Sequence, residues 1–207
     1  MVTAHWIRHG QTEWNRAGRV QGQTDSPLSE RGREQAEATA ELLRGRTMQA
    51  LYSSDLGRAE HTAKILGATL QLLPRLDRRL REMSYGILEG MTWNEAEQAH
   101  PEVYRTLRGG GPDVRVPSGE SRLDLVERAL DFLSDIARWH RADEEVVIVS
   151  HGGVIAYLLR AILRIPYDVK PGFRTLNCGI STFVHQNSEW KLQTWGRVDH
   201  LQGLLDP

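Results

Sequence analysis

The sequence predicts an α/β protein: a single-domain, three-layer α/β/α sandwich with a mostly parallel central sheet. Short apolar runs alternate with longer segments of helical periodicity along the 207 residues, an order typical of a parallel sheet covered by helices on both faces. Neither an internal repeat nor a long linker interrupts this alternation. We therefore expect residues 1–207 to form one domain, since a chain of this length can bury a core of its own.

Six short apolar or β-branched runs have the composition of strands. The run at residues 145–149 contains three valines and an isoleucine, as is typical of a strand buried on both faces. Pro74 interrupts another run, because proline cannot donate a hydrogen bond to a neighbouring strand. The expected strands are residues 3–7, 49–52, 72–76, 145–149, 181–185 and 190–195.

Helical periodicity accounts for the segments between these strands. Ser29 suits the N-cap of a helix that ends near Gly45, because a serine hydroxyl accepts backbone N–H groups of the first turn. Residues 53–55, Ser-Ser-Asp, are expected to cap the next helix, which carries Arg58 in its first turns. Shorter helices are expected at residues 93–99, 102–107 and 154–163.

The clearest helical pattern follows Gly119. Apolar residues recur there at steps of three and four, which places them on one helix face, and we expect that face to be buried. Its members are Leu123, Val126, Leu130, Leu133 and Ala137. The glycines at residues 109–111 resemble a phosphate-binding loop only superficially, because no strand leads into them and no Lys-Ser/Thr pair follows.

The charge distribution excludes several classes of partner. The net charge is −1 and both signs are interspersed, so we expect neither a nucleic-acid-binding face nor a polybasic membrane patch. The N-terminus lacks the apolar segment of a signal peptide, and no apolar run approaches the length of a membrane span. The single cysteine, Cys178, cannot form an internal disulfide. We expect a cytoplasmic protein with a small-molecule partner.

Two of the expected strands lead into a histidine followed by a glycine. The motifs are Arg8-His9-Gly10 and Ser150-His151-Gly152. Ligands of parallel sheets bind beyond the carboxyl ends of the strands, so neighbouring strands would bring the two histidines together. Arg58, near a helix start, can reach the same point. Such a concentration of positive charge needs an anionic ligand, and phosphate is the best geometric match.

Each of these residues also has an ordinary structural explanation. Arg8 could pair with a carboxylate near the rim of the sheet, and Arg58 could pair with Glu60 or Asp55. Glu82 could be a solvated loop residue, as most glutamates are. His151 could begin a helix without binding a ligand. The residues taken alone leave these alternatives open.

No compact metal-binding cluster is evident in the sequence. His5 and His9 have the spacing of zinc ligands on a helix. On a strand, however, four residues span about 13 Å, which is too far for one ion. We therefore expect neither a metal nor another cofactor.

The order of several short motifs resembles the histidine phosphatase superfamily, and within it the phosphoglycerate-mutase-like group. The motifs span most of residues 3–160, and together they are far more specific than any one alone. In order, they are Arg8-His9-Gly10 with Thr12, Trp14 and Asn15; residues 25–29 with Gly32 and Ala36; Ser53, Leu56, Arg58-Ala59 and Thr62-Ala63; Leu80-Arg81-Glu82 with Gly86 and Glu89-Gly90; Gly119-Glu120-Ser121; and residues 150–153. Gln11 departs from the family, which commonly has glutamate there, and its role stays open.

The resemblance implies a role for each candidate residue. His9 would be the nucleophile and would become a phosphohistidine. Glu82 would be the general acid that protonates the leaving oxygen and then activates water. The remaining residues would bind the phosphate: Arg8, Arg58 and His151, together with Asn15, Gln21, Gly22 and Gly152 as neutral donors.

A phosphatase and a mutase would use this same site. Mutases of the family that depend on bisphosphoglycerate usually carry a longer segment after the glutamate, with paired arginines and a lysine. Residues 85–117 are short and contain neither an adjacent arginine pair nor a lysine. This favours a phosphomonoesterase for small phosphorylated metabolites, similar to the broad-specificity bacterial phosphatases. A cofactor-dependent phosphoglycerate mutase is the alternative, and a non-catalytic phospho-ligand-binding module is a minor one.

The segment after Glu82 is expected to contact the leaving group. Trp93, Tyr104, Arg105 and Arg108 offer aromatic and cationic groups for modest-sized phosphate esters. The role of residues 93–117 in specificity, the physiological substrate and the oligomeric state are left open by the sequence.

Overall fold

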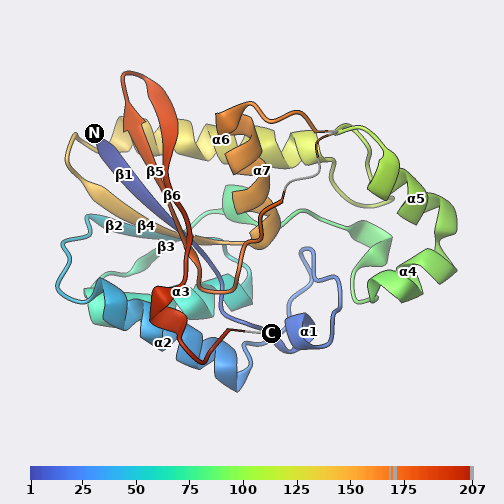
Figure 1. Ribbon diagram of the computed structural model, residues 1–207, viewed down its shortest axis with the longest axis horizontal. Helices are drawn as coiled ribbons and strands as arrows, with labels where there is room; N and C mark the ends of the chain where they lie inside the picture. The colour runs from blue at the N-terminus through green and yellow to red at the C-terminus, as the bar shows by residue number, and fades with distance from the viewer. Residues whose placement is uncertain (168, 170–171, 206–207) are drawn as a thin grey trace.

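Strand β1 (Val2–Arg8) runs through the middle of a six-stranded sheet of order β3-β2-β4-β1-β5-β6 (Figure 1). The computed structural model describes residues 1–167, 169 and 172–205. The other strands are β2 (Ala50–Ser53), β3 (Pro74–Leu76), β4 (Glu145–Ser150), β5 (Ile180–Gln186) and β6 (Glu189–Arg197). All six expected strands are confirmed, with small shifts at their ends.

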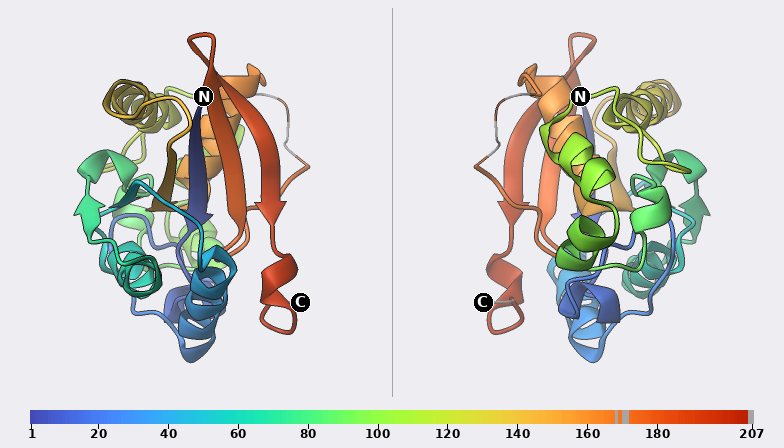
Figure 2. Two further views of the ribbon diagram at one scale, coloured as in Figure 1. Left: turned by 90° about the vertical axis from the view of Figure 1, so that its left-hand side faces the viewer. Right: turned by 90° about the vertical axis from the view of Figure 1, so that its right-hand side faces the viewer.

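The sheet is parallel on one side of β1 and antiparallel on the other. β1 pairs in parallel with β4, β4 with β2, and β2 with β3. On its other side β1 is antiparallel to β5, and β5 and β6 form a hairpin at the edge of the sheet (Figure 2). The predicted α/β class and mostly parallel sheet are therefore confirmed.

Helices cover both faces of this sheet and give three layers (Figure 1). Helices α2 (Glu30–Leu43) and α3 (Gly57–Leu70) pack on one face, and α6 (Arg122–Trp139) and α7 (Gly152–Leu163) on the other. Side chains alternate between the two layers, because successive residues of a strand point to opposite faces. Trp6 and Ile148 lie in the core with α6 and α7, whereas Ile7 and Val147 lie in the core with α2 and α3.

The remaining elements are short and lie mainly around one end of the sheet. Helices α4 (Trp93–Ala99) and α5 (Pro101–Gly109) pack together beyond it (Figure 1). The others are α1 (Glu13–Arg16), η1 (Arg78–Leu80), η2 (Gly86–Leu88) and η3 (Asp199–Leu201). Among the helices of the described residues, none combines the length and the apolar composition needed to cross a membrane.

The two predicted helix starts have different outcomes. Ser29 is the N-cap of α2 and its Oγ accepts the Gly32 N–H at 3.0 Å, as expected. The prediction that residues 53–55 cap α3 is wrong, since Leu56 is the N-cap and has no side-chain cap bond. Instead, Asp25 Oδ1 accepts the Arg58 N–H at 3.3 Å from a loop 33 residues earlier. Because this capping group belongs to a distant loop, the sequence around residues 53–58 does not indicate it.

The predicted buried face of α6 is wrong in part. Leu123 and Leu130 are 45% and 40% exposed, respectively. The buried apolar side chains form a row rotated around the helix from the predicted one: Leu125, Val126, Ala129, Phe132, Leu133 and Ile136. Two apolar rows overlap in this sequence, and packing against the sheet and η1 decides which of them is covered.

Candidate active site

The two histidine motifs lie side by side because β1 and β4 are neighbouring parallel strands. Arg8 is in register with Ser150, and the His9 N–H donates to the Ser150 carbonyl oxygen at 2.9 Å. The imidazole rings of His9 and His151 have centroids 5.2 Å apart, and both residues are buried. The expected convergence of these two histidines is therefore confirmed.

The ring of His9 is held in one tautomer. Nδ1 lies 2.8 Å from the Gly10 carbonyl oxygen, and because a carbonyl only accepts, Nδ1 carries the proton and Nε2 keeps a lone pair. Burial, together with the charges of Arg58 and Arg8, holds the pKa of His9 well below its ordinary value of 6.5. A neutral imidazole with its lone pair on Nε2 is a competent nucleophile.

Gly10 allows the chain to turn tightly against α2. A Cβ on Gly10 would lie 2.3 Å from the Gly32 carbonyl oxygen, so a larger residue does not fit. Thr62 Oγ1 accepts the Gly10 N–H at 3.0 Å and donates to the Arg58 carbonyl oxygen at 2.8 Å. These bonds tie the position of His9 to α3, the helix that carries Arg58.

His151 is the second buried imidazole. Its Nε2 lies 2.8 Å from Ser54 Oγ. Ser54 Oγ accepts the Leu56 N–H at 3.3 Å. Its Nδ1 is buried and has no hydrogen-bond partner within the part of the chain that the structure describes. Burial, followed by the charges of Arg58 and His9, holds the pKa of His151 well below 6.5. An unpaired buried polar atom is costly, so Nδ1 indicates where a ligand atom would bind.

Arg58 is almost entirely buried, with 1% of its surface exposed. Nη2 donates to the Gly22 carbonyl oxygen at 2.6 Å, and Nη1 donates to the Thr24 carbonyl oxygen at 3.0 Å and to Asp25 Oδ1 at 3.1 Å. Burial lowers the pKa of Arg58 from 12.5, against the charges of Glu82 and Asp25, and the side chain remains cationic at neutral pH. Its buried Nε has no partner among the described residues.

Arg8 extends beside the start of α7. Nη1 donates to the Thr175 carbonyl oxygen at 2.7 Å. A Cβ on Gly152 would lie 3.0 Å from Thr175 Oγ1 and 3.4 Å from Arg8 Nε, so glycine permits this close packing. Gly152 is also the first residue of a 12-residue helix, whose N-terminal N–H groups and dipole favour an anion.

Glu82 lies half-buried between η1 and η2, against the start of α7. Its Oε1 accepts the Met83 N–H at 2.9 Å, and its Oε2 accepts the Gly153 N–H at 3.0 Å. A Cβ on Gly153 would lie 2.3 Å from Oε1, so the absence of a side chain leaves room for the carboxylate. The Glu82 carboxylate is thus bound to the first turn of α7 at Gly153, two residues after His151.

Of the neutral candidates, Asn15 lies in α1, and Gln21 and Gly22 lie in the loop that follows it. Asn15 Oδ1 accepts the Thr12 N–H at 3.2 Å and the Asn177 Nδ2–H at 3.3 Å. Gln21 Oε1 accepts the Thr12 hydroxyl at 3.0 Å. Because these contacts use the amide oxygens, the amide N–H groups of both side chains remain as donors for a ligand.

Sequence reasoning named Glu89 as part of a motif but missed that its side chain holds two of the site loops together. Glu89 Oε1 accepts the N–H groups of Gln23 at 3.0 Å and Tyr85 at 2.9 Å, and Oε2 accepts the Thr24 N–H at 2.8 Å. Gly22 has φ +56°, and a Cβ there would lie 2.1 Å from Glu89 Oε1, so glycine is required. A glutamate in a loop gives no local indication of partners this distant in sequence.

Of the four residues expected to contact a leaving group, Trp93, Tyr104 and Arg108 form a cluster. The Arg108 guanidinium carbon lies 5.9 Å from the Trp93 ring centroid and 5.8 Å from that of Tyr104. Arg105 instead pairs with Glu102 at the surface, at 2.8 Å. Contact between these four residues and a leaving group stays a prediction.

The arrangement can bind a tetrahedral oxyanion and present it with a nucleophile and a carboxyl group. A hollow of about 410 Å³ is lined by Arg8, Asn15 and residues 173–177 among others, so of the charged site residues it reaches Arg8. Within the described ranges, no three His, Cys, Asp or Glu side chains are grouped so as to hold a metal ion. The site side chains described above offer two imidazoles, a carboxyl group and two guanidinium groups.

Comparison with known proteins gives a consistent family assignment. Residues 5–198 match the family model described as histidine phosphatase superfamily, branch 1. A metal-independent phosphoserine phosphatase of Arabidopsis thaliana is 38% identical over 96% of this chain and 82% of that protein. A probable phosphoglycerate mutase GpmB of Proteus mirabilis is 37% identical over 99% of this chain and 97% of that protein. A solved mycobacterial glucosyl-3-phosphoglycerate phosphatase in complex with VO3 has a TM-score of 0.84 and 35% identity, covering 94% of this chain and 98% of that one.

Proposed function

The chain belongs to the histidine phosphatase superfamily, branch 1, and on that basis we propose a metal-independent phosphomonoesterase that hydrolyses small phosphorylated metabolites through a phosphohistidine on His9. The observation that supports this most directly is the neutral, buried His9, whose pKa is lowered by burial and by the charges of Arg58 and Arg8. The family and the relatives support phosphatase or mutase chemistry in general. The nucleophile and the roles that follow are our proposal.

In the first step, Nε2 of His9 attacks phosphorus opposite the leaving oxygen, and the N–P bond forms as the P–O bond breaks. Glu82 enters this step protonated and transfers its proton to the leaving oxygen, so that an alcohol departs. Arg8 and Arg58 bind the non-bridging oxygens and stabilise their charge in the transition state. His151 Nδ1 and Arg58 Nε, which are buried and have no partner among the described residues, would donate to the same oxygens.

Donation from His151 requires a proton on Nδ1, and we assign it there. Ser54 Oγ accepts the Leu56 N–H, and its own proton can be donated to His151 Nε2 at 2.8 Å. The neutral ring then carries its hydrogen on Nδ1. The amide groups of Asn15 and Gln21 and the backbone N–H groups of Gly22 and Gly152 would add neutral donors.

In the second step, water attacks the phosphorus of the phosphohistidine and the N–P bond breaks. The Glu82 carboxylate now accepts a proton from that water, which reverses its role in the first step. Inorganic phosphate leaves, His9 returns to its neutral form, and Glu82 is protonated for the next cycle.

Trapping the covalent intermediate tests this mechanism. Enzyme quenched in base during turnover of a radiolabelled phosphate ester is expected to carry a label that acid releases, as phosphohistidine does. His9→Ala should carry no label, whereas His61→Ala, which changes an exposed histidine of α3, should label normally. Rapid turnover without labelled enzyme, or a label that persists in His9→Ala, would contradict the proposal.

The probable phosphoglycerate mutase among the relatives supports a second candidate function. A mutase would return the phosphoryl group to a second hydroxyl before water reaches it. We expect phosphate release to exceed isomerisation of 3-phosphoglycerate in the presence of bisphosphoglycerate, because residues 85–117 contain neither an adjacent arginine pair nor a lysine. Faster isomerisation would reverse this assignment. Phosphoserine and glucosyl-3-phosphoglycerate, named in two of the relatives, are the first substrates to include in a panel.

A further inference from the structure

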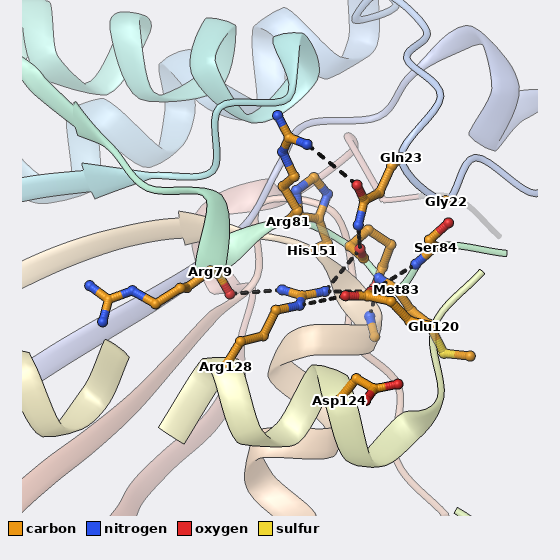
Figure 3. Close-up of polar contacts among 12 residues, drawn as sticks. Gly22, Gln23, Arg79, Arg81, Met83, Ser84, Glu120, Asp124, Arg128 and His151 are labelled. Atoms are coloured by element: carbon orange, nitrogen blue, oxygen red, sulfur yellow. Dashed lines mark hydrogen bonds and ion pairs between the residues drawn. The ribbon is translucent and has the colours of Figure 1, made fainter. Parts of the chain in front are cut away.

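We propose that Arg128 and Glu120 are positioning residues that hold the proposed general acid, Glu82, without contacting its carboxylate. This inference rests on the function proposed for Glu82. Arg128, on α6, donates from Nη2 to the Glu82 carbonyl oxygen at 3.0 Å and from Nη1 to the Arg79 carbonyl oxygen at 2.7 Å (Figure 3). One guanidinium group therefore fixes the backbone from η1 to Glu82.

Glu120 holds the backbone on the other side of Glu82. Its two carboxylate oxygens accept from Arg128 Nε and Nη2, each at 3.0 Å, a two-point pair that fixes the guanidinium plane. Oε2 also accepts the Ser84 N–H at 3.0 Å, and the Glu120 N–H donates to the Ser84 carbonyl oxygen at 3.0 Å. The charged side chains are only 16% and 22% exposed, so solvent weakens their pairing less than it would at the surface.

A third contact links this arrangement to the loop that holds Arg58. Gln23 Nε2 donates to the Glu82 carbonyl oxygen at 3.3 Å, and the preceding residue, Gly22, accepts from Arg58 Nη2 at 2.6 Å (Figure 3 includes Gln23 and Gly22). The Glu82 carbonyl thus receives donors from α6 and from the Gly22 loop. The position of Glu82 is set jointly with that of the proposed phosphate-binding arginine.

Holding Glu82 through its backbone has a chemical advantage. A general acid must be protonated in the first step, and an arginine in direct contact with its carboxyl group would favour the ionised form. The hydrogen bonds to the Glu82 carboxylate come from the N–H groups of Met83 and Gly153 instead. Arg128 directs its charge to Glu120, so the segment is fixed without an ion pair between Arg128 and the Glu82 carboxyl group.

The dependence of rate on the leaving group separates a positioning role from a merely structural one. Phenol is a weak acid and needs a proton as it leaves, whereas 4-nitrophenol is a stronger acid and leaves readily as the anion. Displacing the general acid therefore slows phenyl phosphate much more than 4-nitrophenyl phosphate. A defect in folding or in phosphate binding slows both substrates alike.

We expect Arg128→Met to lower kcat/KM for phenyl phosphate about 100-fold and that for 4-nitrophenyl phosphate less than about fivefold, the same pattern as Glu82→Gln. Arg128→Lys should lose about 10-fold on phenyl phosphate, since lysine keeps the charge but cannot reproduce the guanidinium fork. Glu120→Gln should show the same selective loss. The matched control is Arg138→Met, which removes an exposed arginine of α6 that pairs with Asp135, and both substrates should be unaffected.

Thermal unfolding and circular dichroism of each variant accompany the kinetics. If Arg128→Met does not fold, Arg128→Lys and Glu120→Gln decide the matter. Equal losses on the two substrates, or no loss, would overturn the positioning role. If Glu82→Gln is selective and the Arg128 and Glu120 variants are not, only this inference fails. If Glu82→Gln slows both substrates equally, the acid role of Glu82 fails and the inference fails with it.

Discussion

At the scale of single residues, the described carboxylates neutralise the charge of Arg58 only in part. Asp55, which could have paired with Arg58, instead accepts two hydrogen bonds from Arg81 at 2.7 and 2.6 Å. Asp25, the carboxylate that does contact Arg58, is 41% exposed, so solvent weakens the pair. The guanidinium of Arg58 can therefore stabilise a bound phosphoryl group.

Replacing this charge tests how catalysis is divided among the residues. Arg58→Ala is expected to lower kcat for 4-nitrophenyl phosphate by about 10²–10³-fold, as is typical for loss of an oxyanion-stabilising donor. An acid–base residue supplies only about 10²–10⁴-fold of the acceleration that phosphate-monoester hydrolysis requires, so binding and charge must supply the rest. Lys64→Ala, on the exposed side of the same helix, is the control. Near-normal turnover in folded Arg58→Ala would contradict this division.

At the scale of elements, the first turn of α7 brings three functions together. His151 is its N-cap, Gly152 allows Arg8 to approach closely, and the Gly153 N–H binds the Glu82 carboxylate. The helix owes this capacity to two consecutive glycines. A Cβ at Gly153 would enter the space of the Glu82 carboxylate, and a Cβ at Gly152 would lie 3.0 Å from Thr175 Oγ1.

Gly153→Ala is expected to affect activity far more than stability. The new Cβ would lie 2.3 Å from Glu82 Oε1, the end of a flexible side chain that can move aside at little cost to the fold. The displaced carboxyl group would no longer reach the leaving oxygen, so kcat for phenyl phosphate should fall about 10–100-fold. The control is Gly109→Ala, because a Cβ there meets no atom within 4 Å. Unchanged kcat in Gly153→Ala would show that Glu82 needs no fixed position.

The elements differ in how far the sequence could predict them. The strands were predictable because buried β-branched runs such as residues 145–149 stand out from their surroundings. The buried face of α6 was not, since Leu123 and Leu125 begin two overlapping apolar rows and only tertiary packing distinguishes them. The start of α3 was not, because its cap, Asp25, comes from a separate loop.

At the scale of the whole molecule, several histidines are buried in their neutral form. Burial is the largest cause of a lowered pKa at His5, His9, His151 and His200. The unfolded chain binds protons at these residues near pH 6.5, whereas the folded chain does so only at lower pH. Between these values the unfolded state holds more protons, so the free energy of unfolding falls as the pH falls.

This linkage predicts weaker folding at mildly acidic pH. The urea midpoint is expected to be lower at pH 5.5 than at pH 7.5, with each neutral histidine contributing up to about 1.4 kcal/mol per pH unit. The paired carboxylates, such as Asp55 and Glu145, have lowered pKa values and contribute only at more acidic pH. The measurement requires phosphate-free buffer, since a bound anion would stabilise the folded state. An equal or higher midpoint at pH 5.5 would contradict the neutral assignment.

The assembly of the site could be predicted in outline but not in its supports. His9, Arg58 and His151 follow strand ends or helix starts, positions that a parallel sheet brings to one edge. The supporting roles of Arg128 and Glu120 were not predictable, although Glu120 belongs to one of the motifs, because a charged residue on or beside an amphipathic helix ordinarily faces solvent. Their partners are backbone carbonyl and N–H groups of another segment, which no side-chain pattern encodes.

The central place of β1 has a consequence for biosynthesis. Its sheet partners are β4, which begins at Glu145, and β5, which begins at Ile180, so β1 is synthesised long before the strands with which it pairs. Pairings this distant in sequence slow folding and leave open strand edges in the nascent chain. His9 and His151 therefore come together only after β4 has been synthesised, because β4 leads into His151.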